Sequence, residues 1–125
     1  MGIASLDHVN LRTTRLDEMI EWYCNMLGMQ VGPRPPFPFP GAWLYVGEHA
    51  YVHLVGVEAE ATGSETELKL EHFAFSANGL DSFEAHLKTN DVRYHRADLT
   101  AVDIVQLNVW DPAGNHVHID FPADE

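Results

Sequence analysis

The stretch "LDHVNL" at residues 6–11 decides the fold, because a variant of it, "LEHFAF", returns at residues 70–75. The offset between the two stretches is 64 residues, and the residues that follow them match at the same offset. A second pair, "VHL" at 52–54 and "VHI" at 117–119, repeats with an offset of 65. The chain is therefore a duplicated module with one histidine near the beginning and another near the end of each copy.

Both copies predict the same order of elements. Alternating apolar residues predict a strand at about 4–11 and another at about 69–75. A helix follows each strand, and Gly28 ends the first helix while Asn78 is the candidate N-cap of the second. The helices are predicted from apolar residues at helical spacing: Met19, Ile20, Tyr23, Met26 and Leu27 in the first copy, and Leu80, Phe83 and Leu87 in the second.

Paired strands are predicted after each helix. In the first copy they cover 42–47 and 50–56, with a turn at Glu48 and His49. In the second copy, "VQLNVWD" and "HVHIDF" flank the turn signal at 111–115. The five prolines between 32 and 42 exclude a regular central strand and predict an ordered loop.

Length and composition predict one domain over residues 1–125. Module 1 covers about 4–56, an acidic linker about 57–68 and module 2 about 69–122. The single cysteine, Cys24, excludes an intramolecular disulfide and a CxxC motif. A formal charge of −12 argues against nucleic acid as a partner. Since the chain shows neither a long apolar run nor a leader, we expect no membrane segment and a cytoplasmic protein.

The order of four motifs, "LDHVNL", "YCNMLGMQVG", "LEHFAF" and "DPAGNHVHI", resembles the glyoxalase/bleomycin-resistance/dioxygenase superfamily, also called vicinal oxygen chelate proteins. The resemblance covers nearly the whole chain. It implies an α+β fold in which two tandem βαβββ modules form curved mixed sheets around a central cavity. It also implies a divalent metal ion (Zn, Ni, Co, Mn or Fe) held by the first and last strands of each module.

Carried over residue by residue, the resemblance implies four metal ligands: His8, His53, His72 and His118. The residue chemistry agrees, because neutral imidazole binds such metals well and strand alternation aims the rings at one face. A lone histidine in an apolar strand is more often a hydrogen-bonded core residue, but four at corresponding positions favour a metal site. The remaining histidines lack this correspondence: His49, His86, His95 and His116.

The four-histidine set departs from the family pattern, which usually has glutamate at the last position. In the absence of that carboxylate, His53 or His118 is expected to act as the catalytic base. Asp120 lies two residues after His118 on the same strand face, so it is expected to orient the ring or to replace it as a ligand. His116 shares this face and either lines the cavity or lies at its rim.

Two functions remain open. One is a metal-dependent enzyme that acts on a small oxygen-rich or aromatic substrate by dioxygenase, lyase or isomerase chemistry. The alternative is a metal-free binding protein of the bleomycin-resistance type, for which the acidic charge and the tryptophans would suit a cationic ligand. Phe37 and Phe39 of the proline-rich loop either shape a lid over the cavity or cover a sheet edge or dimer seam. Exposed sheet edges predict a homodimer.

Overall fold

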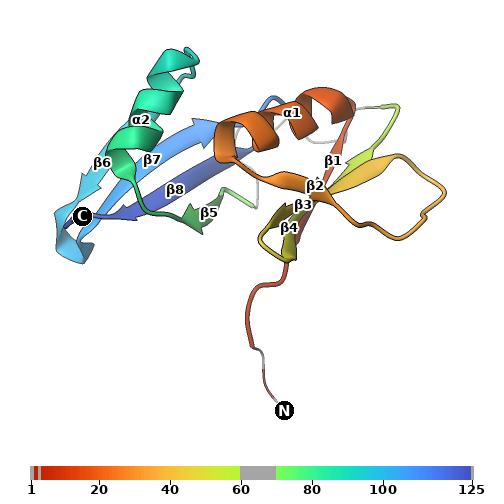
Figure 1. Cartoon of the computed structure of the whole chain (residues 1–125), viewed down its shortest axis with the longest axis horizontal. Coiled ribbons are helices and arrows are strands. Elements are labelled where there is room, and N and C mark those ends of the chain that lie inside the picture. Colours follow the sequence, from red (N-terminus) through yellow and green to blue (C-terminus); the bar gives the residue numbers. More distant parts are fainter. Residues whose placement is uncertain (1, 3, 60–69, 125) are drawn as a thin grey trace. The chain divides into compact units, whose positions relative to one another are not determined.

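The computed structural model describes residue 2, residues 4–59 and residues 70–124, and the chain divides into two compact units, 1–62 and 63–125 (Figure 1). Most of the predicted linker lies outside the described residues. Unit 1 contains β1 (Val9–Thr13), α1 (Leu16–Leu27), β2 (Gln30–Gly32), β3 (Gly41–Val46) and β4 (His49–Gly56). Unit 2 contains β5 (Phe73–Ser76), α2 (Leu80–Thr89), β6 (His95–Leu99), the short 3₁₀ helix η1 (Thr100–Val102), β7 (Ile104–Trp110) and β8 (His116–Pro122).

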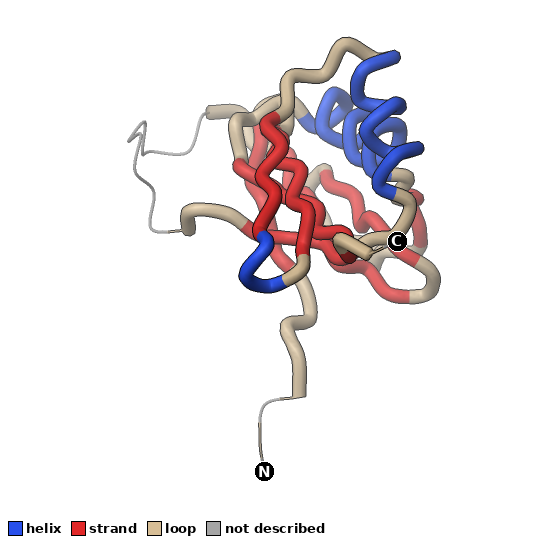
Figure 2. Tube along the Cα trace, turned by 90° about the vertical axis from the view of Figure 1, so that its left-hand side faces the viewer, coloured by secondary structure: helices blue, strands red, loops and turns tan. Residues whose placement is uncertain are grey.

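Each unit is built on one four-stranded mixed sheet. The strand order is β1-β4-β3-β2 in unit 1 and β5-β8-β7-β6 in unit 2. In both sheets the first strand pairs in parallel with the last strand of the unit, and the other neighbours are antiparallel. The strands are drawn in red and the helices in blue in Figure 2. The predicted α+β class with two βαβββ modules is confirmed.

Alternation along β3 and β4 separates the two faces of the sheet in unit 1. Helix α1 packs against β2, β3 and β4. Its Met19 and Tyr23 are fully buried, as are Leu44 of β3 and Val52 of β4. Because side chains alternate along a strand, the next pair of cross-strand partners, Trp43 and His53, lies on the opposite face of the sheet, away from the helix.

The same division holds in unit 2. Val117 and Phe121 of β8 are fully buried, and the Phe121 ring lies 5.6 Å from the Phe83 ring of α2. His116, His118 and Asp120 alternate with these residues, so they share the face away from the helix. Helix packing in each unit therefore selects which histidines line the open face of its sheet.

The first strands of both units begin later than predicted. β1 begins at Val9 and not near residue 4, and β5 begins at Phe73 and not near residue 69. Apolar alternation indicates extended backbone, but the ladder begins only where a partner strand is available, here Val52 for Val9 and Val117 for Phe73. His8 and His72 thus each lie one residue before a strand.

Two other local predictions are corrected. The N-cap of α2 is Gly79, with no side-chain cap hydrogen bond, so Asn78 does not cap the helix. The turn between β3 and β4 lies at Gly47 and Glu48, because glycine accepts the left-handed φ of +61° and His49 is already part of β4. The predicted stop at Gly28 is confirmed: its φ is +72° and its N–H bonds to the carbonyl of Cys24.

The βαβββ order implies a strand directly after each helix, but the residue ranges of these strands, β2 and β6, were not predicted. β2 has three residues, and β6 is largely exposed, so neither shows an apolar alternation. The expectation that the proline-rich segment forms a loop is confirmed, because residues 33–40 contain no strand. No helix in the described part of the chain is long and apolar enough to cross a bilayer.

Candidate metal centre

The two histidines predicted as ligands in unit 1 are in direct ring contact. The His8 and His53 rings stack with centroids 3.9 Å apart and planes within 10°. Trp43, the cross-strand partner of His53, stacks on the same ring at 4.0 Å. The His53 imidazole therefore lies parallel to two aromatic neighbours, which fixes its plane.

Hydrogen bonds decide which ring nitrogens of this pair carry hydrogen. His8 Nδ1 donates to Asp7 Oδ2 at 2.6 Å, and His53 Nε2 donates to the Ala50 carbonyl at 3.2 Å. His49 Nε2 donates to the Asp7 carbonyl at 2.7 Å. Because these acceptors cannot donate, the lone pairs of His8 Nε2 and His53 Nδ1 are left for other partners.

The electrostatics of unit 1 favour a neutral His53 and an ionised Asp7. Burial is the main cause that lowers the pKa of His53, and repulsion from His8 adds to it. The hydrogen bond from His8 is the main cause that lowers the pKa of Asp7. A neutral imidazole beside an ionised carboxylate is the form in which histidine binds metals.

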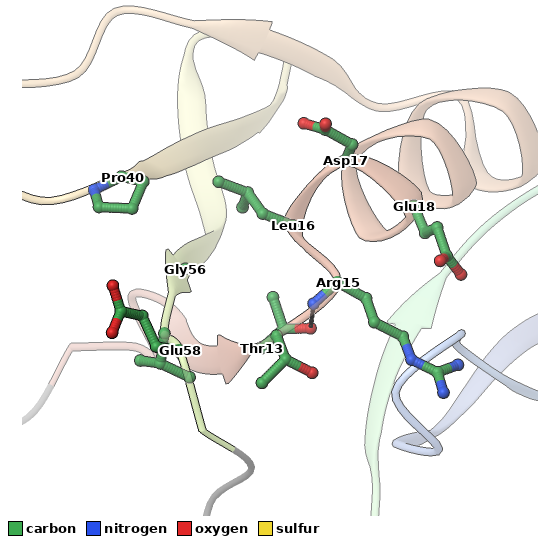
Figure 3. Close-up of a pocket in the computed structure, with 10 residues that line it drawn as sticks. Thr13, Arg15, Leu16, Asp17, Glu18, Pro40, Gly56 and Glu58 are labelled. Carbon is green, nitrogen blue, oxygen red and sulfur yellow. Dashed lines mark hydrogen bonds between the residues drawn. The ribbon is translucent and has the colours of Figure 1, made fainter.

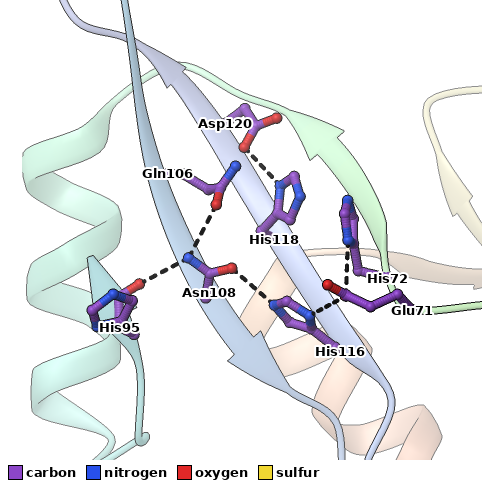
Figure 4. Close-up of polar contacts among 8 residues, drawn as sticks. All are labelled: Glu71, His72, His95, Gln106, Asn108, His116, His118 and Asp120. Carbon is purple, nitrogen blue, oxygen red and sulfur yellow. Dashed lines mark hydrogen bonds and ion pairs between the residues drawn. The ribbon is translucent and has the colours of Figure 1, made fainter. Parts of the chain in front are cut away.

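The second predicted pair is also brought together, within unit 2. The rings of His72 and His118 lie 4.2 Å apart, and His118 is only 7% exposed. His118 Nδ1 donates to Asp120 Oδ1 at 2.8 Å, so its Nε2 carries the lone pair (Figure 4). Asp120 thus occupies the orienting position expected from its spacing, while its role toward a metal stays a prediction.

A hydrogen-bonded cluster next to this pair was not predicted. Glu71 Oε2 accepts from His72 Nδ1 at 2.9 Å and from His116 Nδ1 at 2.8 Å. His116 Nε2 in turn donates to Asn108 Oδ1 at 2.8 Å (Figure 4). These contacts lower the pKa of Glu71, with the bond from His116 the larger cause and that from His72 the second. Each of these side chains belongs to unit 2, and together they join β5, β7 and β8.

Glu71, Asn108 and Asp7 were not predicted as part of the centre, and Trp43 was considered only among the tryptophans that would suit a cationic ligand. Asp7 and Glu71 carried a signal, because each directly precedes a predicted ligand and the two are 64 residues apart. Asn108 and Trp43 carried none, since only the register of the strands brings them beside His116 and His53. His116 is half-buried and hydrogen-bonded to Glu71, and whether it lines a cavity or lies at its rim stays a prediction.

Phe37 and Phe39 form a small aromatic group in the proline-rich loop of unit 1. Their rings stack at 5.1 Å, and both residues are 41% exposed. The Arg34 guanidinium lies 5.1 and 5.2 Å from the two rings. Phe37 also lies 6.4 Å from Trp43, so the loop extends the aromatic surface next to His53. Its role as a lid or a dimer seam stays a prediction.

A groove in unit 1 is lined by none of the residues of these clusters. It has a volume of about 470 Å³ and is lined at the start of α1 by Arg15, Asp17 and Glu18, with Glu58 opposite (Figure 3). The Arg15 N–H donates to Thr13 Oγ1 at 2.9 Å, which shapes the entry to the helix. No histidine is among the residues that line this groove, so it is not the predicted centre.

The histidine and carboxylate side chains described above are chemically suited to bind a divalent metal ion. Imidazole nitrogens and a carboxylate oxygen are the ligands that Zn, Ni, Co, Mn and Fe bind in proteins. In unit 2, one ligand atom from each of Glu71, His72 and His116 lies within 4.8 Å of the others. Neighbouring carboxylates also hold the hydrogen of His8 and His118 on Nδ1, as is common for metal-bound histidine.

The fold and these histidine pairs define a class of protein. The Glyoxalase/Bleomycin resistance protein/Dioxygenase superfamily model matches residues 5–119, and the chain belongs to this family. A curated relative, Glyoxylase I 4 of Arabidopsis thaliana, is 29% identical, and the match covers 95% of this chain and 71% of that protein.

Solved structures share the fold. A glyoxalase family protein from Bacillus anthracis superposes with a TM-score of 0.78 at 21% identity, covering 98% of each chain. A glyoxylase/bleomycin resistance protein/dioxygenase domain from Frankia sp. EAN1pec gives 0.79 at 20% identity, covering 97% of this chain and 93% of that one. A lactoylglutathione lyase from Agrobacterium tumefaciens gives a TM-score of 0.73 at 17% identity, covering 97% of this chain and 96% of that one.

Proposed function

We propose that the protein is a divalent-metal-dependent enzyme that acts on a small oxygen-rich or aromatic substrate. The observation that carries this proposal is the ring-to-ring pairing of two histidines at corresponding places in both units, His8 with His53 and His72 with His118. Four unrelated core histidines would have no reason to meet in pairs on the helix-free face of each sheet.

The polar partners of these histidines support the proposal. Asp7, Glu71 and Asp120 each accept a hydrogen bond from the Nδ1 of a predicted ligand. A carboxylate behind a histidine fixes the ring orientation and makes the opposite nitrogen a better donor to a metal. A core histidine needs only a neutral partner, so three carboxylates favour a metal-binding role.

Several residues of the chain have distinct roles in such an enzyme. A divalent ion held by the histidines would supply Lewis acidity to a small substrate with neighbouring oxygens. In a centre where His118 is not itself a ligand, its Nε2 lone pair can accept a substrate proton, and Asp120 holds the ring in place for that transfer. Trp43 and Phe37 present aromatic surface beside His53, which suits the flat part of an aromatic substrate.

Metal analysis of untagged protein tests the proposal. We expect about one divalent ion per chain, and a loss of metal of at least about tenfold in His8→Ala and in His72→Ala, since outer-shell changes alone reach that scale. His86→Ala, on α2, is the matched control and should keep its metal. A wild-type protein that takes up no Zn, Ni, Co, Mn or Fe would reject the enzyme in favour of the metal-free binding protein.

That second function has its own support. The formal charge of −12 and the aromatic group of Phe37, Phe39 and Trp43 suit a flat cationic ligand. Fluorescence titration with a cationic aromatic dye, against an anionic dye of the same size, would then show selective quenching that Trp43→Ala removes.

A further inference from the structure

We propose that Glu71, His72 and His116 form the metal site of unit 2, so that Glu71 supplies the carboxylate ligand that a four-histidine set lacks. The inference rests on the proposed metal-dependent function and changes its ligand set. Neither Glu71 nor His116 lies at a position that the family resemblance assigned to the metal.

The spacing of the three ligand atoms supports this site. Glu71 Oε2 lies 2.9 Å from His72 Nδ1 and 2.8 Å from His116 Nδ1. Around an ion that binds each ligand at about 2.1 Å, adjacent octahedral ligands lie about 3.0 Å apart. Two of the three separations are therefore already close to those of neighbouring ligands, and all three ligand atoms lie within 4.8 Å of one another.

Asn108 selects the nitrogen of His116 that faces this site. Asn108 Nδ2 donates to the His95 carbonyl at 3.2 Å, and that carbonyl can only accept. The amide oxygen must therefore face His116, whose Nε2 donates to it at 2.8 Å. When an ion takes the place of the proton that His116 Nδ1 shares with Glu71, Nε2 keeps its hydrogen on Asn108, so Nδ1 is the nitrogen that offers its lone pair to the ion. Asn108 is thus a positioning residue for a ligand.

His72 has two nitrogens, and the choice between them distinguishes two ligand sets. Through Nε2, its partner would be His118, which gives two nitrogen ligands from this unit. Through Nδ1, its partners are Glu71 and His116, which give two nitrogens and one oxygen. Two histidines and one carboxylate are a common set for reactive divalent metals and leave positions open for substrate. His118, held by Asp120, then remains available as a base.

Cobalt binding to untagged, metal-stripped protein tests the inference, with Co²⁺ absorption and metal content as readouts. We expect Glu71→Gln and His116→Ala each to weaken Co²⁺ binding at least about 100-fold, and His118→Ala to weaken it less than about tenfold. Asn108→Leu should weaken binding about 10- to 100-fold, and Asn108→Asp, which keeps an acceptor for His116 Nε2 but opposes the His95 carbonyl, should restore part of it. His95→Ala and Asp81→Asn are the matched controls and should bind as the wild type does.

The opposite pattern overturns the inference. If His118→Ala removes the metal while Glu71→Gln and His116→Ala retain it, the ligands are His72 and His118, and the proposed metal-dependent function still stands. If the wild type binds no Co²⁺, the proposed function fails as well. The Glu71 side chain is 70% exposed, so Glu71→Gln reports on binding without disturbing the fold.

Discussion

Replacing Asp111 tests whether one carboxylate holds the hairpin that carries His116 and His118. Asp111 is 4% exposed and lies at the start of the turn between β7 and β8. Its Oδ1 accepts the N–H groups of Ala113 at 3.0 Å and Asn115 at 2.8 Å, and its Oδ2 accepts Asn115 Nδ2 at 2.8 Å. Asp111→Ala removes three charge-assisted bonds at once.

The expected cost follows from these bonds. A hydrogen bond to a charged group contributes about 1.5–3 kcal/mol, but water can reach Ala113 and part of Asn115 once the carboxylate is gone. We therefore expect Asp111→Ala to lower the free energy of unfolding by about 2–4 kcal/mol, which corresponds to a melting temperature lower by roughly 10 °C. Urea unfolding followed by circular dichroism measures it, and Asp124→Ala, an exposed carboxylate, is the control.

Two further variants separate the two oxygens. Asp111→Asn keeps an acceptor for both backbone N–H groups, but it turns its own side-chain amide N–H group toward that of Asn115. It should therefore lower the free energy of unfolding by less than half as much as Asp111→Ala does. In the double variant D111N/N115D the side chain at 111 donates and the side chain at 115 accepts, the reverse of the wild type. The double variant should therefore be more stable than Asp111→Asn. If Asp111→Ala unfolds within about 0.5 kcal/mol of the wild type with an unchanged m value, the carboxylate does not hold the turn.

Three other outcomes are expected. In NMR titrations the pKa of His53 should lie below the ordinary histidine range, because burial lowers it. The folded state then binds fewer protons than the unfolded state, so the free energy of unfolding should fall as pH drops from about 6.5 through the folded pKa. His53→Gln should make this dependence of the free energy of unfolding on pH less steep. Bound metal should leave near pH 5–6, as its histidine ligands take up protons, whereas full occupancy well below pH 4 would indicate a carboxylate-dominated site. Light scattering at micromolar concentration should give a homodimer, because each sheet has two edge strands, and a monomer would reject this.

The repeated motif and its spacing predicted the modules, their helices and the turn after β7. These are local or periodic features: an apolar stripe at helical spacing, a glycine at a helix end, and a carboxylate that bonds to backbone two and four residues ahead. The repeat also singled out His8, His53, His72 and His118 as equivalent residues of the two modules, and their role as metal ligands, which the family resemblance implies, stays a prediction.

Strand register and side-chain packing in the folded chain determined the features that the sequence did not predict. β2 and β6 form only because a longer neighbour offers its hydrogen-bonding edge, and the start of β1 depends on where β4 can pair with it. The contact of Trp43 with His53 and that of Asn108 with His116 join residues on neighbouring strands. Glu71 and His116 are 45 residues apart in the chain, and parallel pairing of β5 with β8 brings them together. A linear sequence reveals its own periodicity, whereas the partner of a side chain across a sheet is fixed by hydrogen-bond register, which is a property of the folded chain.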